Sequence, residues 1–164
     1  MKEKRKVAIY PGTFDPITNG HLDVIERAVS LFDIVLIAVT TNPAKKPLFS
    51  VQERIDMIVK ATSGLNNVSV ESFEGLLMDF AIKKNAVAVV RGLRAISDFE
   101  FEFQMALVNR KLAKEIVTVF LMPNEKYTYL NSTIVKEVAK YNGDVSSFVT
   151  PEVNKQLKRK FEKK

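Results

Sequence analysis

The sequence predicts an α/β fold in which helices cover both faces of a doubly wound, five-stranded parallel sheet. Short apolar runs of strand length alternate along the chain with stretches of helical periodicity. Several runs, such as residues 34–39, contain almost no polar residue, which is typical of strands buried on both faces of a parallel sheet. A length of 164 residues fits one domain, so we expect a single unit over 1–164 with a C-terminal helix, about 151–162, as an appendage.

The first half of the chain contains three predicted strands and three predicted helices. The strands are Val7–Tyr10, Ile34–Val39 and a half-exposed run from Val68 to about Ser72. Apolar residues recur at helical spacing from Leu22 to Phe32. Ser50 and Glu53 form a capping box that opens the second helix. A short third helix is expected around Leu77, Phe80 and Ala81.

The second half contains the remaining two strands, which we expect at Ala86–Val90 and Ile116–Leu121. Ser97 and Glu100 form a second capping box, predicting a helix from there to about Ala113. A helix over Ser132–Lys140 is stopped by Asn142-Gly143, and Thr150-Pro151 starts the last one.

The composition excludes several kinds of site. The chain has no cysteine, so disulfides, thiolate nucleophiles, zinc fingers and iron–sulfur clusters are excluded. It has one histidine, which excludes a multi-histidine metal site. No apolar run approaches the length of a membrane span, and the charged N-terminus has no apolar segment behind it. We therefore expect a cytoplasmic protein without a membrane partner.

The net charge of +6 is concentrated at the two ends of the chain. Residues 2–6 carry a charge of +3 and residues 155–164 a charge of +5, which leaves −2 for the stretch between them. Charged tails are usually solvated, and the aromatic residues are mostly phenylalanines within apolar patterns. Nucleic acid is therefore not expected as a partner.

The loops after the first, second, fourth and fifth strands should carry the chemistry, because doubly wound sheets bind ligands beyond the carboxyl ends of their strands. The first of these loops, residues 10–21, places two glycines and the only histidine before a helix N-terminus, which is a natural phosphate site. The alternative is a tight turn in which Asp15 and Asn19 only satisfy backbone groups. For His21 we favour a functional role, with one ring nitrogen facing the ligand.

Residues 12–21 resemble the G-T-F-D-P-x-T-x-G-H motif of the phosphopantetheine adenylyltransferases, within the nucleotidyltransferases that carry an H-x-G-H or T-x-G-H motif. The match is unbroken over ten residues, and Thr18 is typical of the phosphopantetheine branch. The resemblance extends over about residues 6–160 and implies a Rossmann-like nucleotidyltransferase fold. It assigns Thr13 and Phe14 to ATP, Thr13 also to the substrate, and His21 to catalysis at the α-phosphate.

Two further loops resemble the same family. Residues 41–48 place two lysines between prolines, and the resemblance assigns Lys45 to the substrate phosphate and to catalysis. Residues 91–94 read R-G-L-R. The resemblance places Arg91 on the phosphopantetheine side as a catalytic and binding residue, and Gly92, Leu93 and Arg94 around ATP. In the alternative reading, these arginines form ion pairs with Asp98, Glu100 or Glu102. We expect such a pairing for one of the two arginines rather than for both.

The loop after the fifth strand collects hydroxyls and an amide at another helix start, where one of them must cap the helix. It resembles the triphosphate-binding element of the family, although Asn131 replaces the usual serine and Tyr127 stands where some members have tryptophan. The assigned ATP contacts are Tyr127, Thr128, Tyr129, Leu130, Asn131, Ser132 and Thr133. The resemblance also assigns Glu102 to the adenosine and Leu77 to the substrate. Two alternatives remain for Leu77 and Met78: they line the pantetheine arm, or they pack in the core.

The resemblance implies adenylyl transfer from ATP to 4′-phosphopantetheine, giving dephospho-coenzyme A and pyrophosphate, with Mg²⁺ accompanying ATP and no dedicated protein metal site. It also implies a homohexamer and coenzyme A as a feedback inhibitor.

The helix after Asp98 is apolar on two stripes, which agrees with a subunit contact. One stripe contains Phe99, Phe103 and Ala106, and the other contains Phe101, Met105, Val108 and Leu112. The alternatives are a sibling enzyme using CTP with a phosphorylated alcohol or ATP with nicotinamide mononucleotide, and a non-catalytic nucleotide or RNA binder.

Overall fold

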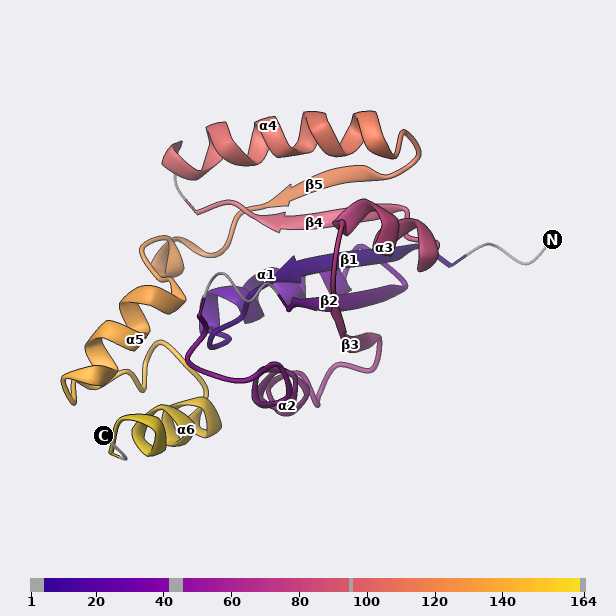
Figure 1. The fold of residues 1–164 in the computed structure, drawn as a ribbon. Helices are drawn as coiled ribbons and strands as arrows, with labels where there is room; N and C mark the ends of the chain where they lie inside the picture. The colour runs from indigo at the N-terminus through magenta and orange to yellow at the C-terminus, as the bar shows by residue number, and fades with distance from the viewer. Residues whose placement is uncertain (1–4, 42–45, 95, 163–164) are drawn as a thin grey trace.

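The computed structural model describes residues 5–41, 46–94 and 96–162. A five-stranded parallel sheet forms its centre, in the order β3-β2-β1-β4-β5 (Figure 1). The strands are β1 (Val7–Gly12), β2 (Ile34–Thr40), β3 (Val68–Phe73), β4 (Ala88–Gly92) and β5 (Val117–Leu121). The chain proceeds outward from β1 to β3 on one side and then from β4 to β5 on the other. This arrangement confirms the predicted fold class and places the switch in strand order between β1 and β4.

The fourth strand begins two residues later than predicted. Ala86 belongs to the turn after the preceding helix, where its N–H donates to the Ala81 carbonyl at 3.0 Å. The paired segment starts at Ala88, which lies opposite Ala8 on β1 and Val117 on β5. Both 86–87 and 88–90 are apolar, so hydrophobicity alone could not separate the turn from the strand.

The helices are α1 (Asn19–Val29), α2 (Val51–Ala61), α3 (Leu77–Lys83), α4 (Ile96–Leu112), α5 (Ser132–Lys140) and α6 (Pro151–Glu162), and η2 (Glu125–Tyr127) is a 3-10 helix. The predicted capping box of α2 is confirmed. The Glu53 N–H donates to the Ser50 hydroxyl, and the Ser50 N–H donates to the Glu53 carboxylate. The second predicted box is wrong, because α4 begins at Ile96 and Ser97 therefore lies inside the helix.

Two hydrophobic clusters lie on the two faces of the sheet. Alternate residues of β1 enter different clusters, with Tyr10 in one and Ile9 in the other, as the pleat requires. The first cluster contains buried residues of α1, α2, α5 and α6, and the second contains Met78 of α3. Leu157 of α6 is fully buried in the first cluster, so the helix expected as an appendage is anchored in the core.

None of the helices in the described ranges is long and apolar enough to cross a membrane.

Candidate active site

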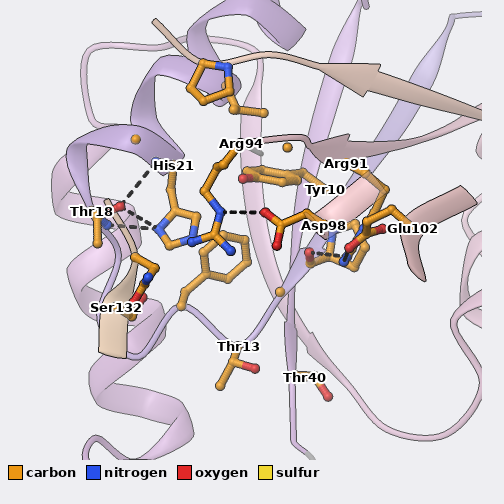
Figure 2. Close-up of a pocket in the computed structure, with 18 of the residues that line it drawn as sticks. Tyr10, Thr13, Thr18, His21, Thr40, Arg91, Arg94, Asp98, Glu102 and Ser132 are labelled. Atoms are coloured by element: carbon orange, nitrogen blue, oxygen red, sulfur yellow. Dashed lines mark hydrogen bonds and ion pairs between the residues drawn. The ribbon is translucent and has the colours of Figure 1, made fainter. Parts of the chain in front are cut away.

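A cavity of about 670 Å³ lies at the carboxyl ends of the strands (Figure 2). The last residues of four strands line it: Gly12, Thr40, Phe73 and Gly92. This is the edge at which a doubly wound sheet binds its ligands. Tyr10 and Pro11 of β1 and Arg91 of β4 line it as well, and the remaining lining residues come from the loops and helices that follow these strands and from the chain after β5.

Most of the sequence-predicted site residues line this cavity. They are Thr13, Phe14, His21, Leu77, Arg91, Gly92, Arg94, Glu102, Leu130, Asn131, Ser132 and Thr133. Leu77 lies on the cavity wall, whereas Met78 is buried in the second cluster and so takes the core alternative. Lys45 lies outside the described residues.

Four predicted ATP contacts do not line the cavity: Leu93, Tyr127, Thr128 and Tyr129. Tyr127 ends the 3-10 helix η2, and the Thr128 hydroxyl caps it by donating to the Glu125 carbonyl at 2.8 Å. Tyr129 is exposed, with its ring edge-on to Phe148. The segment lines the cavity from Leu130 onward, and the ATP contacts of these four residues stay predictions.

His21 is fixed by the cap of α1. It occupies the third position of the helix, and its Nδ1 accepts the Thr18 backbone N–H at 3.0 Å while its own backbone N–H donates to the Thr18 hydroxyl oxygen. Because Nδ1 accepts a hydrogen bond, the proton of the neutral ring is on Nε2. His21 lines the cavity, so this arrangement supplies a hydrogen-bond donor to it.

The pKa of His21 is well below neutral pH, so its ring is uncharged there. Burial lowers the pKa of His21 to about 4, and the nearby Arg94 guanidinium lowers it further in the same direction. His21 therefore adds no positive charge of its own to the site, in contrast to Arg91 and Arg94. At neutral pH the ring is a neutral donor aimed by its cap.

Phe14 supports His21 from the side. Its ring is edge-on to His21, with centroids 5.1 Å apart, and edge-on to Tyr10 at 5.3 Å. A side chain at Gly12 would meet this ring at 2.9 Å, so glycine at that position lets the aromatic ring lie against the strand end. Phe14 is 3% exposed, so its main contribution is to hold the imidazole in place.

Arg91 is paired with Glu102 across the β4–α4 connection. The guanidinium donates two hydrogen bonds to the carboxylate, from Nε at 2.7 Å and from Nη2 at 2.5 Å. Its Nη1 also donates to the Pro11 carbonyl at 3.2 Å. Burial alone would lower the pKa of Arg91, but the Glu102 carboxylate raises it above its ordinary value. Arg91 is therefore a permanent cation held against β1.

Arg94 is paired as well, with Asp98 four residues further on. Its Nε lies 3.2 Å from the carboxylate (Figure 2). Its Nη1 donates to the Leu130 carbonyl at 3.3 Å. Both arginines thus have carboxylate partners, the alternative we judged less plausible for the two together. Each arginine remains on the cavity wall, so an incoming phosphate meets two cations whose positions are already set.

The start of α5 contributes a second helix N-terminus to the cavity. Asn131 is the capping residue, since its side-chain oxygen accepts the Ile134 N–H at 2.9 Å. The Ser132 hydroxyl donates to the Pro16 carbonyl at 2.7 Å and so joins α5 to the β1–α1 loop. The backbone N–H groups of Ser132 and Thr133 have no intrahelical partner, which suits them to an anion.

Asp15 and Asn19 have the structural roles that we gave as the alternative reading of their loop. The Asp15 carboxylate is 3% exposed and accepts the N–H groups of Leu48 and Phe49, each at 2.9 Å. The Asn19 side chain donates to the Ser147 carbonyl at 3.0 Å. Neither residue lines the cavity.

The structure adds cavity residues that the sequence reasoning did not assign: Tyr10, Thr40, Phe73, Asp98 and Phe101 are among them. Tyr10 was expected at the end of the first strand and the start of the first loop, without a role of its own. Burial raises the pKa of its hydroxyl despite the opposing effect of Arg91, so it is a neutral donor. The position of Tyr10 just before the glycine-containing loop was the available signal, because a residue at a strand end faces the ligand edge of the sheet.

No group of three or more histidine, aspartate or glutamate side chains within the described ranges is placed to hold a metal ion. The two carboxylates on the cavity wall, Asp98 and Glu102, are both held by arginines.

The chain is similar to several known proteins. A cytidylyltransferase-like family model matches residues 9–138. The chain is 53% identical over 158 residues to a phosphopantetheine adenylyltransferase of Caldanaerobacter subterraneus subsp. tengcongensis, covering 96% of this chain and 99% of that protein. It is 55% identical over 159 residues to the phosphopantetheine adenylyltransferase of Thermodesulfovibrio yellowstonii, with the same coverage.

A solved structure with the same fold is more distant. It is a bifunctional NMN adenylyltransferase/ADP ribose pyrophosphatase from Francisella tularensis, with a TM-score of 0.73 and 17% identity. The match covers 97% of this chain and 50% of that one, and at this identity it supports the fold alone. The sequence relatives show to which family within this fold the chain belongs, because they match almost its full length at more than 50% identity. The chain belongs to the phosphopantetheine adenylyltransferase family.

Proposed function

We propose that this chain transfers the adenylyl group of ATP to 4′-phosphopantetheine, giving dephospho-coenzyme A and pyrophosphate. The observation that carries the proposal is the cavity, where motif residues from the loops after β1, β4 and β5 meet. The near-complete match to relatives that bear this activity in their names supports the choice of substrate.

The reaction needs no covalent intermediate. The phosphate of phosphopantetheine is itself the nucleophile, and it is largely ionised at neutral pH. It attacks the α-phosphorus of ATP, the new P–O bond forms, and the bond to pyrophosphate breaks. The protein then acts by alignment and by stabilising charge; alignment can contribute about 7–11 kcal/mol toward the barrier.

The residues take separate roles along the line of attack. His21 donates from Nε2 to the α-phosphate, and Thr13 holds the attacking phosphate or its target. Lys45 and Arg91 fix the nucleophile. Arg94 and the N-terminus of α5, at Ser132 and Thr133, hold the β- and γ-phosphates.

Mg²⁺ accompanies the triphosphate as part of the substrate. Since Asp98 and Glu102 are engaged by arginines, we assign the ion no protein ligand.

Coenzyme A contains both the pantetheine arm and an adenylate, so it would compete for the same cavity and inhibit. We place the reaction in the cytoplasm.

The reaction is tested by pyrophosphate release. We expect release with ATP, Mg²⁺ and 4′-phosphopantetheine, and none with CTP plus glycerol 3-phosphate or ATP plus nicotinamide mononucleotide. Release with either of the other pairs would assign the chain to a sibling reaction. Silence with all three would refute the proposal and favour a non-catalytic binder; loss of RNA binding on removal of residues 155–164 would then identify the basic tail as the binding surface.

We also propose that the chain assembles as a homohexamer through α4. Apolar side chains of this helix are exposed in the single chain, from 40% at Met105 to 62% at Phe101. They occur on more than one side of the helix, and Val117 at the adjoining edge strand is 57% exposed. Apolar surface of this extent is typical of a subunit interface.

Sedimentation tests the assembly. We expect a species six times the 18.5 kDa chain mass and its dissociation by Phe101→Glu, which would place a charge in the contact. A wild-type protein that sediments only at 18.5 kDa would contradict the assembly.

A further inference from the structure

Arg54 of α2 is a charged residue in the interior of the protein. Its side chain is 2% exposed, and it is among the largest fully buried side chains in the described part of the chain. Burying an arginine is costly unless its donors are matched and its charge is balanced. An apolar residue of similar size would often stabilise the same position as well or better. The contacts of Arg54 therefore indicate what the charge is used for.

The guanidinium joins two residues of the cavity wall. Its Nη1 donates to the carbonyl of Thr13 at 2.7 Å and to the carbonyl of Thr40 at 3.0 Å. Thr13 follows β1 and Thr40 ends β2, and both line the cavity. The Nε of the same guanidinium lies 3.4 Å from the carbonyl of Ser50, the capping residue of α2. The Arg54 guanidinium thus links the carboxyl ends of the neighbouring strands β1 and β2 to helix α2.

A buried carboxylate balances the charge. Burial lowers the pKa of Arg54, and the nearby Asp15 opposes this shift, so the guanidinium remains charged. Asp15 is also bonded to Lys136 of α5 at 2.6 Å. Two cations therefore face the same carboxylate, but only one of them, Arg54, is bonded to the carbonyls of cavity residues.

We propose that Arg54 is a positioning residue for adenylyl transfer, which fixes Thr13 relative to Thr40 on the wall of the reaction cavity. This inference rests on the proposed function. The Thr13 side chain meets the reacting phosphates, and its backbone is held from behind by the guanidinium. A displacement of about 1 Å at such a group can cost about 10²-fold in rate. The planar guanidinium presents its donors in a fixed geometry, whereas the flexible ammonium of lysine does not.

The test compares three purified full-length variants in the pyrophosphate assay with phosphopantetheine: Arg54→Met, Arg54→Lys and Lys136→Met. Lys136→Met is the matched control, because it also removes a cation from Asp15 but leaves Thr13 and Thr40 held. We expect Arg54→Met to lower kcat by about tenfold to 10²-fold with little change in KM for ATP. Arg54→Lys should recover only part of this loss. Lys136→Met should lose stability, seen in its Tm, with a much smaller loss of kcat.

Three results would overturn the inference. Equal kcat losses in Arg54→Met and Lys136→Met would reduce Arg54 to a charge partner of Asp15, and so would wild-type kcat in Arg54→Met. Wild-type kcat in Arg54→Lys would show that the fixed geometry is not needed; this variant keeps the charge and decides the question if Arg54→Met does not fold. A wild-type protein silent with phosphopantetheine would refute the proposed function itself, and the inference with it.

Discussion

Replacing His21 by alanine is expected to lower kcat by about 10²–10³-fold with little change in KM for ATP. The reason lies in the cap of α1, which holds Nδ1 against the Thr18 N–H and leaves the proton on Nε2. A donor fixed in this way meets the charge that develops on the α-phosphate in the transition state more strongly than the charge already present in bound ATP. Steady-state kinetics with both substrates varied would measure the two constants.

The matched control is His21→Gln, whose terminal amide can place an N–H near the position of Nε2. It should recover part of the kcat lost in His21→Ala, because the donor is partly restored without any ionisable group. A large rise in KM for ATP in His21→Ala, with kcat preserved, would instead make His21 a ground-state binding residue.

The pH dependence separates a neutral donor from a cation. With a pKa of about 4, His21 is uncharged across neutral pH in the free enzyme. The ratio of kcat/KM for ATP between wild type and His21→Gln should therefore stay constant from about pH 5.5 to 8, since kcat/KM reports groups of the free enzyme. A ratio that falls as pH rises through about 6.5 would show that the protonated ring is the active form.

The sequence predicted what local signals determine. The box of Ser50 and Glu53 placed the start of α2 correctly, because both partners lie within one helical turn. The second capping box was predicted from the same kind of signal and is wrong. Ser97 and Glu100 have the required spacing, but α4 begins at Ile96. Sequence spacing defines a possible cap, and the path of the chain decides whether the residue stands at the helix end.

Contacts between distant segments were beyond the reach of pattern reasoning. Arg54 and Thr13 are 41 residues apart, and Arg54 has the ordinary sequence context of a surface helix. The pairing of Arg91 with Glu102 was foreseen only as one of several options, because the choice among Asp98, Glu100 and Glu102 depends on how α4 lies over the sheet. Most residues that the resemblance assigned line the cavity; Tyr127 to Tyr129 do not line it, and their ATP contacts stay predictions.

Replacing Arg91 by methionine is expected to lower kcat/KM for phosphopantetheine by about tenfold to 150-fold, which corresponds to the loss of charged hydrogen bonds worth about 1.5–3 kcal/mol. The variant also leaves Glu102 without its guanidinium in a cavity that must accept two anions. Thermal unfolding should therefore show a lower Tm, since the Glu102 side chain is only 12% exposed and loses both hydrogen bonds from Arg91.

The double variant Arg91→Met/Glu102→Gln separates two roles that the single variant combines. Removing the carboxylate charge should restore much of the Tm, because residue 102 then no longer carries an unpaired charge. It should not restore kcat/KM for phosphopantetheine if Arg91 itself binds the attacking phosphate. Recovery of activity together with stability would mean that Arg91 only neutralises Glu102, and the nucleophile would then depend on Lys45 and Thr13. The difference between the two recoveries therefore measures how much of the Arg91 charge reaches the substrate.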